Sequence, residues 1–281
     1  MGISEVFTIA LGLLAGYFFF ASLFEKQNAD NENTSLSPIF ILLLTICVAS
    51  GYILFTDSTS KLAGIVFFLA LSILAVSFHE FGHAYTALLG GDKSVIRNGY
   101  LSLDPLKYSH PLLSVVMPVL FMLIGGLPLP GGAVYIDESA IRTSLWKIIV
   151  SAAGVAANAI MLLVIVLASS RFPDSGTQVF WSVISFFVYI QIAVVLFNLL
   201  PIPPLDGFSI VTPMLPRALE ETLNQHRATI GFLPLFLFLI PNPIAREIFE
   251  LARAWTQDLG FEQSLISRGS DFVFGFFRNL R

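Results

Sequence analysis

The sequence predicts an all-α polytopic membrane protein with about six transmembrane helices. Of its 281 residues, 56% are hydrophobic and only 12% are charged, whereas a soluble domain carries about 25% charged residues. Several apolar runs reach the roughly 20 residues that a helix needs to cross a bilayer. These runs are Val6–Phe24, Pro38–Phe55, Leu62–Leu89, Leu145–Ser169 and Val179–Leu200. Pro111–Leu127 and Ala228–Pro241 are shorter, so their apolarity alone does not decide whether they cross.

The first two runs form an N-terminal unit that we place at residues 1–56. Val6–Phe24 lacks a basic segment before it and exceeds the length of a signal-peptide core, so we expect a retained helix. The polar stretch Glu25–Leu36 then predicts a solvated loop before Pro38–Phe55.

The loop after the third run indicates the orientation of the chain. Asp92–His110 carries Lys93, Arg97 and Lys107, which makes it the most basic loop between apolar runs. Basic loops stay on the cytoplasmic side of a membrane. We therefore expect Leu62–Leu89 to end on the cytoplasmic side.

Beyond Val179–Leu200 the chain becomes amphipathic. Residues 216–227 favour a helix, and the tail from Asn242 mixes Arg, Glu and aromatic residues in a pattern that suits a helix on the membrane surface. We place a core at residues 57–241 and an amphipathic tail at 242–281.

Charge and cysteine content exclude two classes of function. The net charge of −4 argues against a nucleic-acid partner. Cys47 is the only cysteine, so the chain holds neither an intrachain disulfide nor a cysteine-based zinc cluster. Composition gives no indication of the oligomeric state.

Three titratable residues lie inside the third apolar run. His79 and His83 are four residues apart, so on a helix they share one face and lie about 6 Å apart along the axis. Glu80 is rotated by about 100° from His79. This is the H-E-x-x-H pattern, in which both imidazoles bind zinc and the glutamate is the general base.

The alternative is that these are ordinary buried polar residues. A lone buried histidine is most often a core residue whose hydrogen bonds are satisfied. Here two of four histidines have ligand spacing with a glutamate beside them, and charged groups inside a membrane helix cost at least ~2.5 kcal/mol each. We therefore expect a metal site.

A catalytic zinc takes three protein ligands and leaves one position for water. Asp206 is the candidate third ligand, because it follows Pro201, Pro203 and Pro204, which forbid a regular helix after Val179–Leu200. Non-helical backbone at membrane depth is tolerated only against protein or a water-filled cavity. The alternative is that Asp206 merely begins a cytoplasmic loop.

A shared site restricts the topology. His83 and Asp206 both lie near the C-terminal ends of apolar runs, so those ends must face the same side of the membrane. Leu145–Ser169 and Val179–Leu200 supply two crossings between them, which requires Pro111–Leu127 to dip in and return. The site lies about 13 Å from the polar end at Asp92, inside the bilayer and nearer the cytoplasmic side.

These residues resemble the site-2 protease family of intramembrane zinc metalloproteases. HEFGHA, which contains His79, Glu80 and His83, fits the motif H-E-x-G-H-A. N-L-L-P-I-P-P-L-D-G, from Asn198 to Gly207, fits N-x-x-P-x-P-x-L-D-G. SAAGVAANAIMLL resembles the family's G-P-x-x-N helix, with Gly154 and Asn158 in place and Val155 where proline is common.

The resemblance implies roles for several residues. Asp206 becomes the third ligand of one Zn²⁺ per chain, and Asn198 and Asn158 contact the substrate carbonyl or its oxyanion. For Asn158 the alternative is an interhelical hydrogen bond. PGGAVYID, residues 130–137, fits the family's membrane-associated β-hairpin, where Gly131, Gly132 and Val134 would bind an unwound substrate as an added strand; an ordinary turn and strand is the alternative.

The sequence therefore predicts an intramembrane zinc metalloprotease that cuts transmembrane proteins within or near their membrane spans. The alternative is a membrane metal-binding or scaffold protein of the same fold without proteolysis. A metal transporter should carry polar residues along a path, whereas here they converge on one point. A glutamate third ligand in E-x-x-x-D is not found downstream, and rhomboid-type serine chemistry lacks its G-x-S-x-G.

Overall fold

The computed structural model describes residues 36–108, 134–169, 178–226 and 243–278. Within these ranges the chain is helical, with no β-strand. The long helices are α2 (Pro38–Thr56), α3 (Lys61–Gly90), α7 (Ser144–Ser169), α8 (Gln178–Asn198), α13 (Pro243–Asp258) and α14 (Gln263–Arg278). The short ones are α4 (Ser94–Arg97), η1 (Tyr100–Ser102), α5 (Pro105–Tyr108), α9 (Asp206–Val211), η3 (Thr212–Met214) and α10 (Arg217–Gln225).

Within the described ranges, four helices are long and apolar enough to span a membrane, namely α2, α3, α7 and α8. Each predicted span in the described part of the chain is confirmed as a helix within two residues at either end. The predicted span Val6–Phe24, the proposed re-entrant segment Pro111–Leu127 and the run Ala228–Pro241 lie outside the described residues. So do Gly131 and Gly132 of the predicted hairpin.

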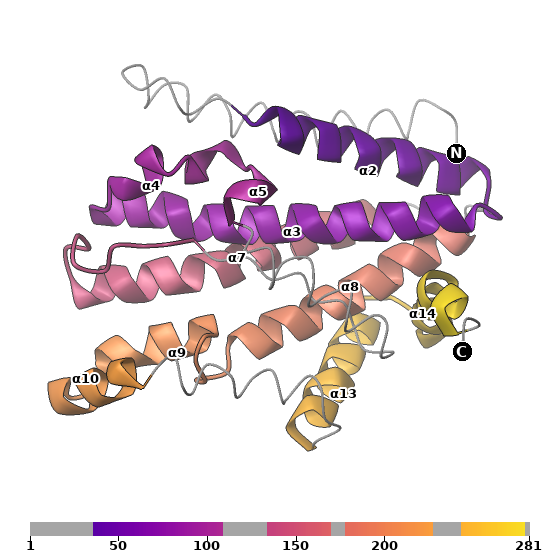
Figure 1. Ribbon diagram of the computed structural model, residues 1–281. Helices are drawn as coiled ribbons and strands as arrows, with labels where there is room; N and C mark the ends of the chain where they lie inside the picture. The colour runs from indigo at the N-terminus through magenta and orange to yellow at the C-terminus, as the bar shows by residue number, and fades with distance from the viewer. Residues whose placement is uncertain (1–35, 109–133, 170–177, 227–242, 279–281) are drawn as a thin grey trace.

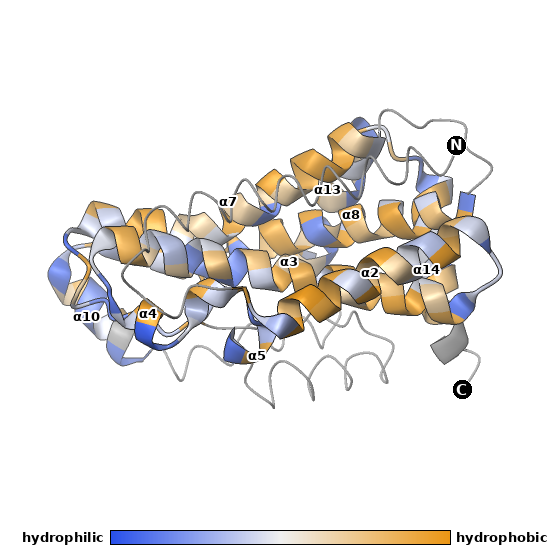
Figure 2. Cartoon of the chain, turned by 90° about the horizontal axis from the view of Figure 1, so that it is seen from above, coloured by the Kyte–Doolittle hydropathy of each residue, from blue (hydrophilic) through white to orange (hydrophobic). Residues whose placement is uncertain are grey.

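Helix α3 is the axis of the bundle (Figure 1). It packs along α7 over much of its length and along α2 on another side, while α8 contacts α7, α13 and α14. The short helix α4 lies over one end of α3 and α5 lies nearer its middle, while α9 and α10 lie at the same end of the molecule as α4. Coloured by hydropathy, this end is the more hydrophilic one (Figure 2).

Local sequence explains where the helices begin and end. At the start of α2, the side chain of Ser37 accepts a hydrogen bond from the Ile39 N–H, and Pro38 follows at the first helical position. At the end of α3, Gly91 adopts φ +123°, which only glycine tolerates well. Its N–H and that of Asp92 then cap the carbonyls of Leu88 and Ala87.

The tail was expected on the membrane surface, but its described helices pack against the bundle. Phe274 of α14 contacts the buried ring of Phe68 on α3 and the ring of Phe186 on α8. Gly269 brings α14 against the Ser182 carbonyl of α8. The apolar face of the amphipathic helix is buried against protein, which satisfies the same pattern that suits a membrane surface.

The close approach at Gly269 gives a test of this packing. Gly269→Ala would push a methyl group into the Ser182 carbonyl oxygen, so we expect it to lower the free energy of unfolding by about 1–3 kcal/mol. Gly275→Ala on the same helix is the control, because nothing lies within 4 Å of its Cβ position. Thermal unfolding in detergent should separate the two variants, and equal stability would contradict the packing.

Candidate metal centre

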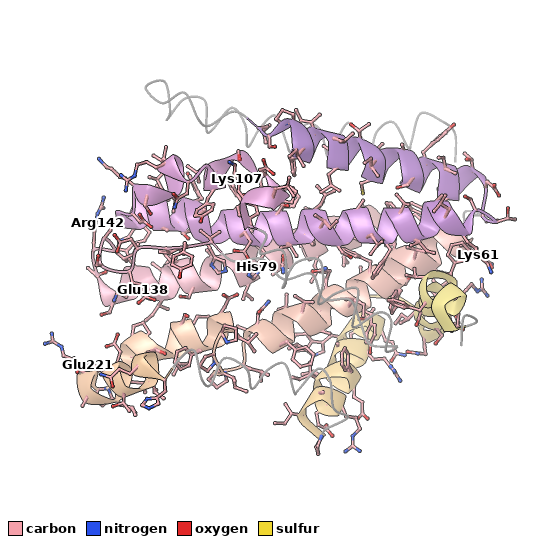
Figure 3. The ribbon with its side chains drawn as sticks, viewed as in Figure 1. Lys61, His79, Lys107, Glu138, Arg142 and Glu221 are labelled. Carbon is pink, nitrogen blue, oxygen red and sulfur yellow. The ribbon has the colours of Figure 1, made fainter. Side chains whose placement is uncertain are left out.

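Helix α3 carries the three residues of the H-E-x-x-H pattern in the interior of the bundle. His79, Glu80 and His83 keep only 8%, 5% and 7% of their surface exposed, and His79 lies near the middle of α3 (Figure 3). Gly82 lies between the histidines, and a Cβ there would stand 2.7 Å from the Ala153 carbonyl oxygen. The absence of a side chain at Gly82 therefore lets α7 approach the histidines.

Asp206 reaches the same point from the break after α8. Helix α8 ends at Asn198, and the proline-containing segment turns the chain so that Asp206 begins α9. Gly207 lies directly against the carbonyl oxygens of Leu199 and Leu200. This tight fold of the break requires glycine and keeps Asp206 close to the end of α8.

The three predicted ligands converge. The Nε2 atoms of His79 and His83 are 3.0 Å apart, and each lies 3.2 Å from an oxygen of Asp206. Zinc binds nitrogen and oxygen at about 2.0–2.2 Å, so two ligand atoms on a tetrahedron are about 3.3–3.6 Å apart. The observed separations approach that spacing, and a modest outward movement would let the three groups hold one zinc ion.

One hydrogen bond orients His83 for metal binding. Its Nδ1 lies 2.7 Å from the carbonyl oxygen of Val150 on α7. A carbonyl only accepts, so Nδ1 carries the proton and the Nε2 lone pair is free to bind a cation. For His79, Nδ1 is buried without a partner among the described residues.

Gly154 of α7 forms the wall beside the two imidazoles. A Cβ at this position would collide with Nε2 of His83 and would lie 2.7 Å from Nε2 of His79. The space in front of the ligand atoms therefore exists because residue 154 has no side chain. This is the cradle that a small cation requires.

Glu80 is held by a backbone donor from a distant part of the chain. The N–H of Val134 donates to Oε2 of Glu80 at 2.8 Å. Val134 was predicted to bind a substrate strand, but its N–H is engaged by Glu80. The Oε1 atom is the carboxylate oxygen that this contact leaves for other chemistry.

The two asparagines of the resemblance differ in their surroundings. Asn158 lies one turn beyond Gly154 on α7, is 3% exposed, and its Oδ1 has no hydrogen-bond partner within the described ranges. Asn198 is the last residue of α8 and is partly buried. Neither residue is a ligand in the converging group formed by His79, His83 and Asp206.

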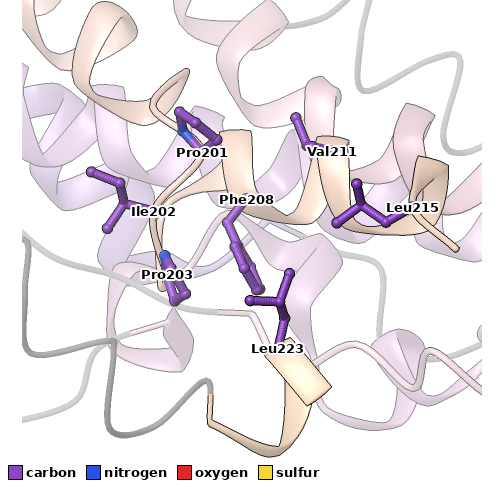
Figure 4. A pocket seen from close by; sticks show the side chains of 7 residues that line it. All are labelled: Pro201, Ile202, Pro203, Phe208, Val211, Leu215 and Leu223. Atoms are coloured by element: carbon purple, nitrogen blue, oxygen red, sulfur yellow. The ribbon is translucent and has the colours of Figure 1, made fainter. Parts of the chain in front are cut away.

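An apolar pocket of about 250 Å³ lies between the break after α8 and helices α9 and α10 (Figure 4). Phe208 of α9 points into it, two residues after Asp206, which places the pocket and the carboxylate on opposite sides of the short helix. Its lining contains no metal-ligating side chain. The other lining residues are Pro201, Ile202, Pro203, Val211, Leu215 and Leu223.

Two imidazoles, one carboxylate and an adjacent glutamate, buried in a bundle whose described part holds four candidate membrane spans, are the groups expected of a membrane-embedded metallohydrolase. The comparisons specify the family. The profile of Peptidase family M50 matches residues 164–241, which include Asp206. The chain is 38% identical to the protein called zinc metalloprotease Rip2 in Mycolicibacterium smegmatis, over 84% of this chain and 93% of that protein.

Other relatives agree. Identity is 34% to the Rip2 protein of Mycobacterium tuberculosis strain Erdman, over 77% of this chain and 85% of that protein. It is 28% to the protein called zinc metalloprotease YwhC in Bacillus subtilis, over 61% and 78%. No solved structure matches the chain. The chain belongs to peptidase family M50, the site-2 protease family, and is an intramembrane zinc metalloprotease.

Two backbone groups at the site could not be found from the sequence. The Val150 carbonyl and the Val134 N–H carry no side-chain signal, and any residue other than proline offers the same N–H. Only their placement against His83 and Glu80 gives them a role. Gly154, in contrast, could be singled out in the sequence because it lies in the G-V-A-A-N segment. Its role as the wall beside the imidazoles became visible only from the packing of α7 on α3.

The cradle gives a direct test. In Gly154→Ala the methyl group would occupy the space before the two imidazoles, so we expect zinc content to fall from about one per chain to below about 0.2. Metal analysis of detergent-purified protein measures this. Ala156→Ser, an addition on the exposed side of the same helix, should retain its zinc. Full zinc content in Gly154→Ala would refute the cradle.

Proposed function

We propose that this chain cleaves membrane proteins within or near their transmembrane segments, with one zinc ion held by His79, His83 and Asp206. The observation that carries the proposal is the convergence of the three ligand atoms, 3.0–3.2 Å apart, in the turn of α3 that also bears Glu80. When bound, zinc would lower the pKa of water towards ~7 and polarise the scissile carbonyl.

Glu80 is the general base in this mechanism. Its Oε1 accepts a proton from the attacking water and then transfers that proton to the leaving amine. The Val134 N–H, which holds Oε2, limits the rotation of the carboxylate and aims Oε1. Burial supports this role, since hydrogen bonds and charges act more strongly where bulk water is excluded.

Substrate binding involves residues beside the ligands. Asn198 and Asn158 would contact the substrate carbonyl or its oxyanion. The Oδ1 of Asn158, buried without a partner within the described part of the chain, would accept a hydrogen bond from a peptide N–H. A membrane helix must unwind before its peptide bonds can be cut. We propose that residues 130–137 receive the unwound segment as an added strand, with Gly131, Gly132 and Val134 beside it.

The proposed topology places the site towards the cytoplasm. The end of α3 near the ligands leads into the basic loop with Lys93, Arg97 and Lys107. Helices α7 and α8 return the chain to the same end, as a shared site requires. About six crossings, a re-entrant segment at Pro111–Leu127 and a membrane-associated hairpin at residues 130–137 complete this topology.

Metal analysis tests the three-ligand site. Wild-type protein should hold about one zinc per chain, and His83→Ala and Asp206→Ala should each lose it or bind it far more weakly, because two ligands cannot close the site. Stoichiometric zinc in Asp206→Ala would remove Asp206 from the ligand set. No zinc in wild type after the metal is restored would favour the non-proteolytic scaffold.

Glu80→Gln separates the base from the metal. The amide cannot accept the proton of water, so cleavage should fall by at least about 10²-fold while zinc content stays at the wild-type level. The assay uses synthetic single-span peptides with a fluorophore–quencher pair across a glycine-rich, weakly helical segment. The peptide that wild type cleaves fastest is used for every variant. Undiminished turnover would exclude Glu80 as the base.

A further inference from the structure

Asp92 is buried, although its place after the end of α3 suggests a solvated loop. Only 1% of its surface is exposed, and both carboxylate oxygens accept backbone hydrogen bonds. The N–H of Ser94 donates to Oδ1 at 2.7 Å, and the N–H of Asp137 donates to Oδ2 at 2.9 Å. A carboxylate is buried at reasonable cost only when it is paired in this manner.

The contact with Asp137 fastens the segment that reaches Glu80. Residues 134–137 are held at both ends, by the Val134 N–H on Glu80 of α3 and by the Asp137 N–H on Asp92, just beyond the end of α3. Between these points the side chains alternate as in an extended chain. Val134 and Ile136 pack against the buried cluster around Ala84 and Ala87, whereas Tyr135 is 82% exposed.

The chain beyond Asp137 strengthens the same attachment. The N–H of Arg142 donates to the Gly90 carbonyl at 3.0 Å, and Gly91 lies so close to the Ala140 carbonyl that a Cβ would stand 2.6 Å away. The side chain of Asp137 turns instead to Ser139, whose hydroxyl and N–H both donate to Oδ1, and these two bonds lower the pKa of the Asp137 carboxyl. The attachment to Asp92 therefore depends on the backbone of residue 137.

We propose that Asp92 is a positioning residue for Glu80, acting through the segment Val134–Asp137. By holding the Asp137 N–H, Asp92 fixes the far end of this four-residue segment. The segment spans about 10 Å from its first to its last residue when extended, and its near end is the donor to Glu80. Release of the far end lets the Val134 N–H move away from the carboxylate. A freed glutamate has several rotamers, and small misplacements of a catalytic group reduce turnover strongly. The proposal rests on Glu80 being the base.

Asp104 provides a matched control. It is also a buried aspartate (7% exposed) in the loop after α3, its Oδ1 accepts the N–H of the residue two positions on, Leu106, at 2.9 Å, and its Oδ2 accepts the hydroxyl of Ser37 at 2.9 Å. The contact of Asp104 with Ser37 leads to the N-cap of α2 rather than to Glu80. Asp92→Asn and Asp104→Asn therefore weaken similar hydrogen bonds. Only the bonds of Asp92 belong to the segment that reaches Glu80.

The experiment compares the two variants with wild type and Glu80→Gln, as full-length detergent-purified protein and with the peptide assay above. In Asp92→Asn we expect kcat to fall roughly tenfold, with KM and zinc content within about twofold of wild type. Hydrogen–deuterium exchange of the peptide covering residues 134–140 should rise. Asp104→Asn should lose comparable thermal stability but keep kcat, KM and the slow exchange of that peptide.

Every other outcome contradicts a specific step of the positioning proposal. An unchanged or increased kcat in Asp92→Asn refutes positioning, and an increase would mean that the segment restrains Glu80. An equal loss of kcat in Asp104→Asn would mean that general destabilisation is the cause. Loss of zinc in Asp92→Asn would assign it to the metal centre instead. If Glu80→Gln itself stays active, the proposed base is wrong, and the positioning role falls with it for a separate reason.

Discussion

The close approach of α3 and α7 is the constraint on which the rest of the structure depends. Two glycines permit it from opposite sides, Gly82 on α3 against the Ala153 carbonyl and Gly154 on α7 against the imidazoles. In a bilayer, helices gain no hydrophobic energy from association, so small residues that allow backbones to approach are the usual basis of packing. Here the same contact brings the Val150 carbonyl within reach of His83 and orients its ring.

The break after α8 solves a different problem. An unbroken α8 would keep a carboxylate on the surface of that helix. The metal centre needs a carboxylate that approaches the two histidines of α3 from another direction. The proline-rich segment ends α8 and starts α9 with Asp206 at its first residue. The free backbone groups of the break are partly used in tight turns, for example between the Leu205 N–H and the Ile202 carbonyl, so the interruption costs less at this depth.

Much of this could be predicted from the sequence because the signals are carried by side chains. Helix spacing placed His79 and His83 on one face, and apolar runs gave the spans of α2, α3, α7 and α8 closely. The features that could not be predicted depend on backbone groups and on which surfaces pack together in the folded chain. The donor to Glu80 is the N–H of Val134, a group that almost any residue has, and Asp92 resembles every other polar residue at the end of a span. The tail pattern fits a lipid surface and a protein surface equally, and packing against Phe68 and Ser182 decided between them.

The convergence of His79, His83 and Asp206 has a mechanical meaning as well as a chemical one. These groups come from α3 and from α9, segments more than 120 positions apart in the chain, and like lone pairs would repel one another at such short range. A divalent cation among them replaces repulsion with attraction and joins the two segments. The single cysteine, Cys47, cannot form an internal bridge. The metal would thus serve as a cross-link where no disulfide can form, and binding free energy at the site would become folding free energy of the bundle.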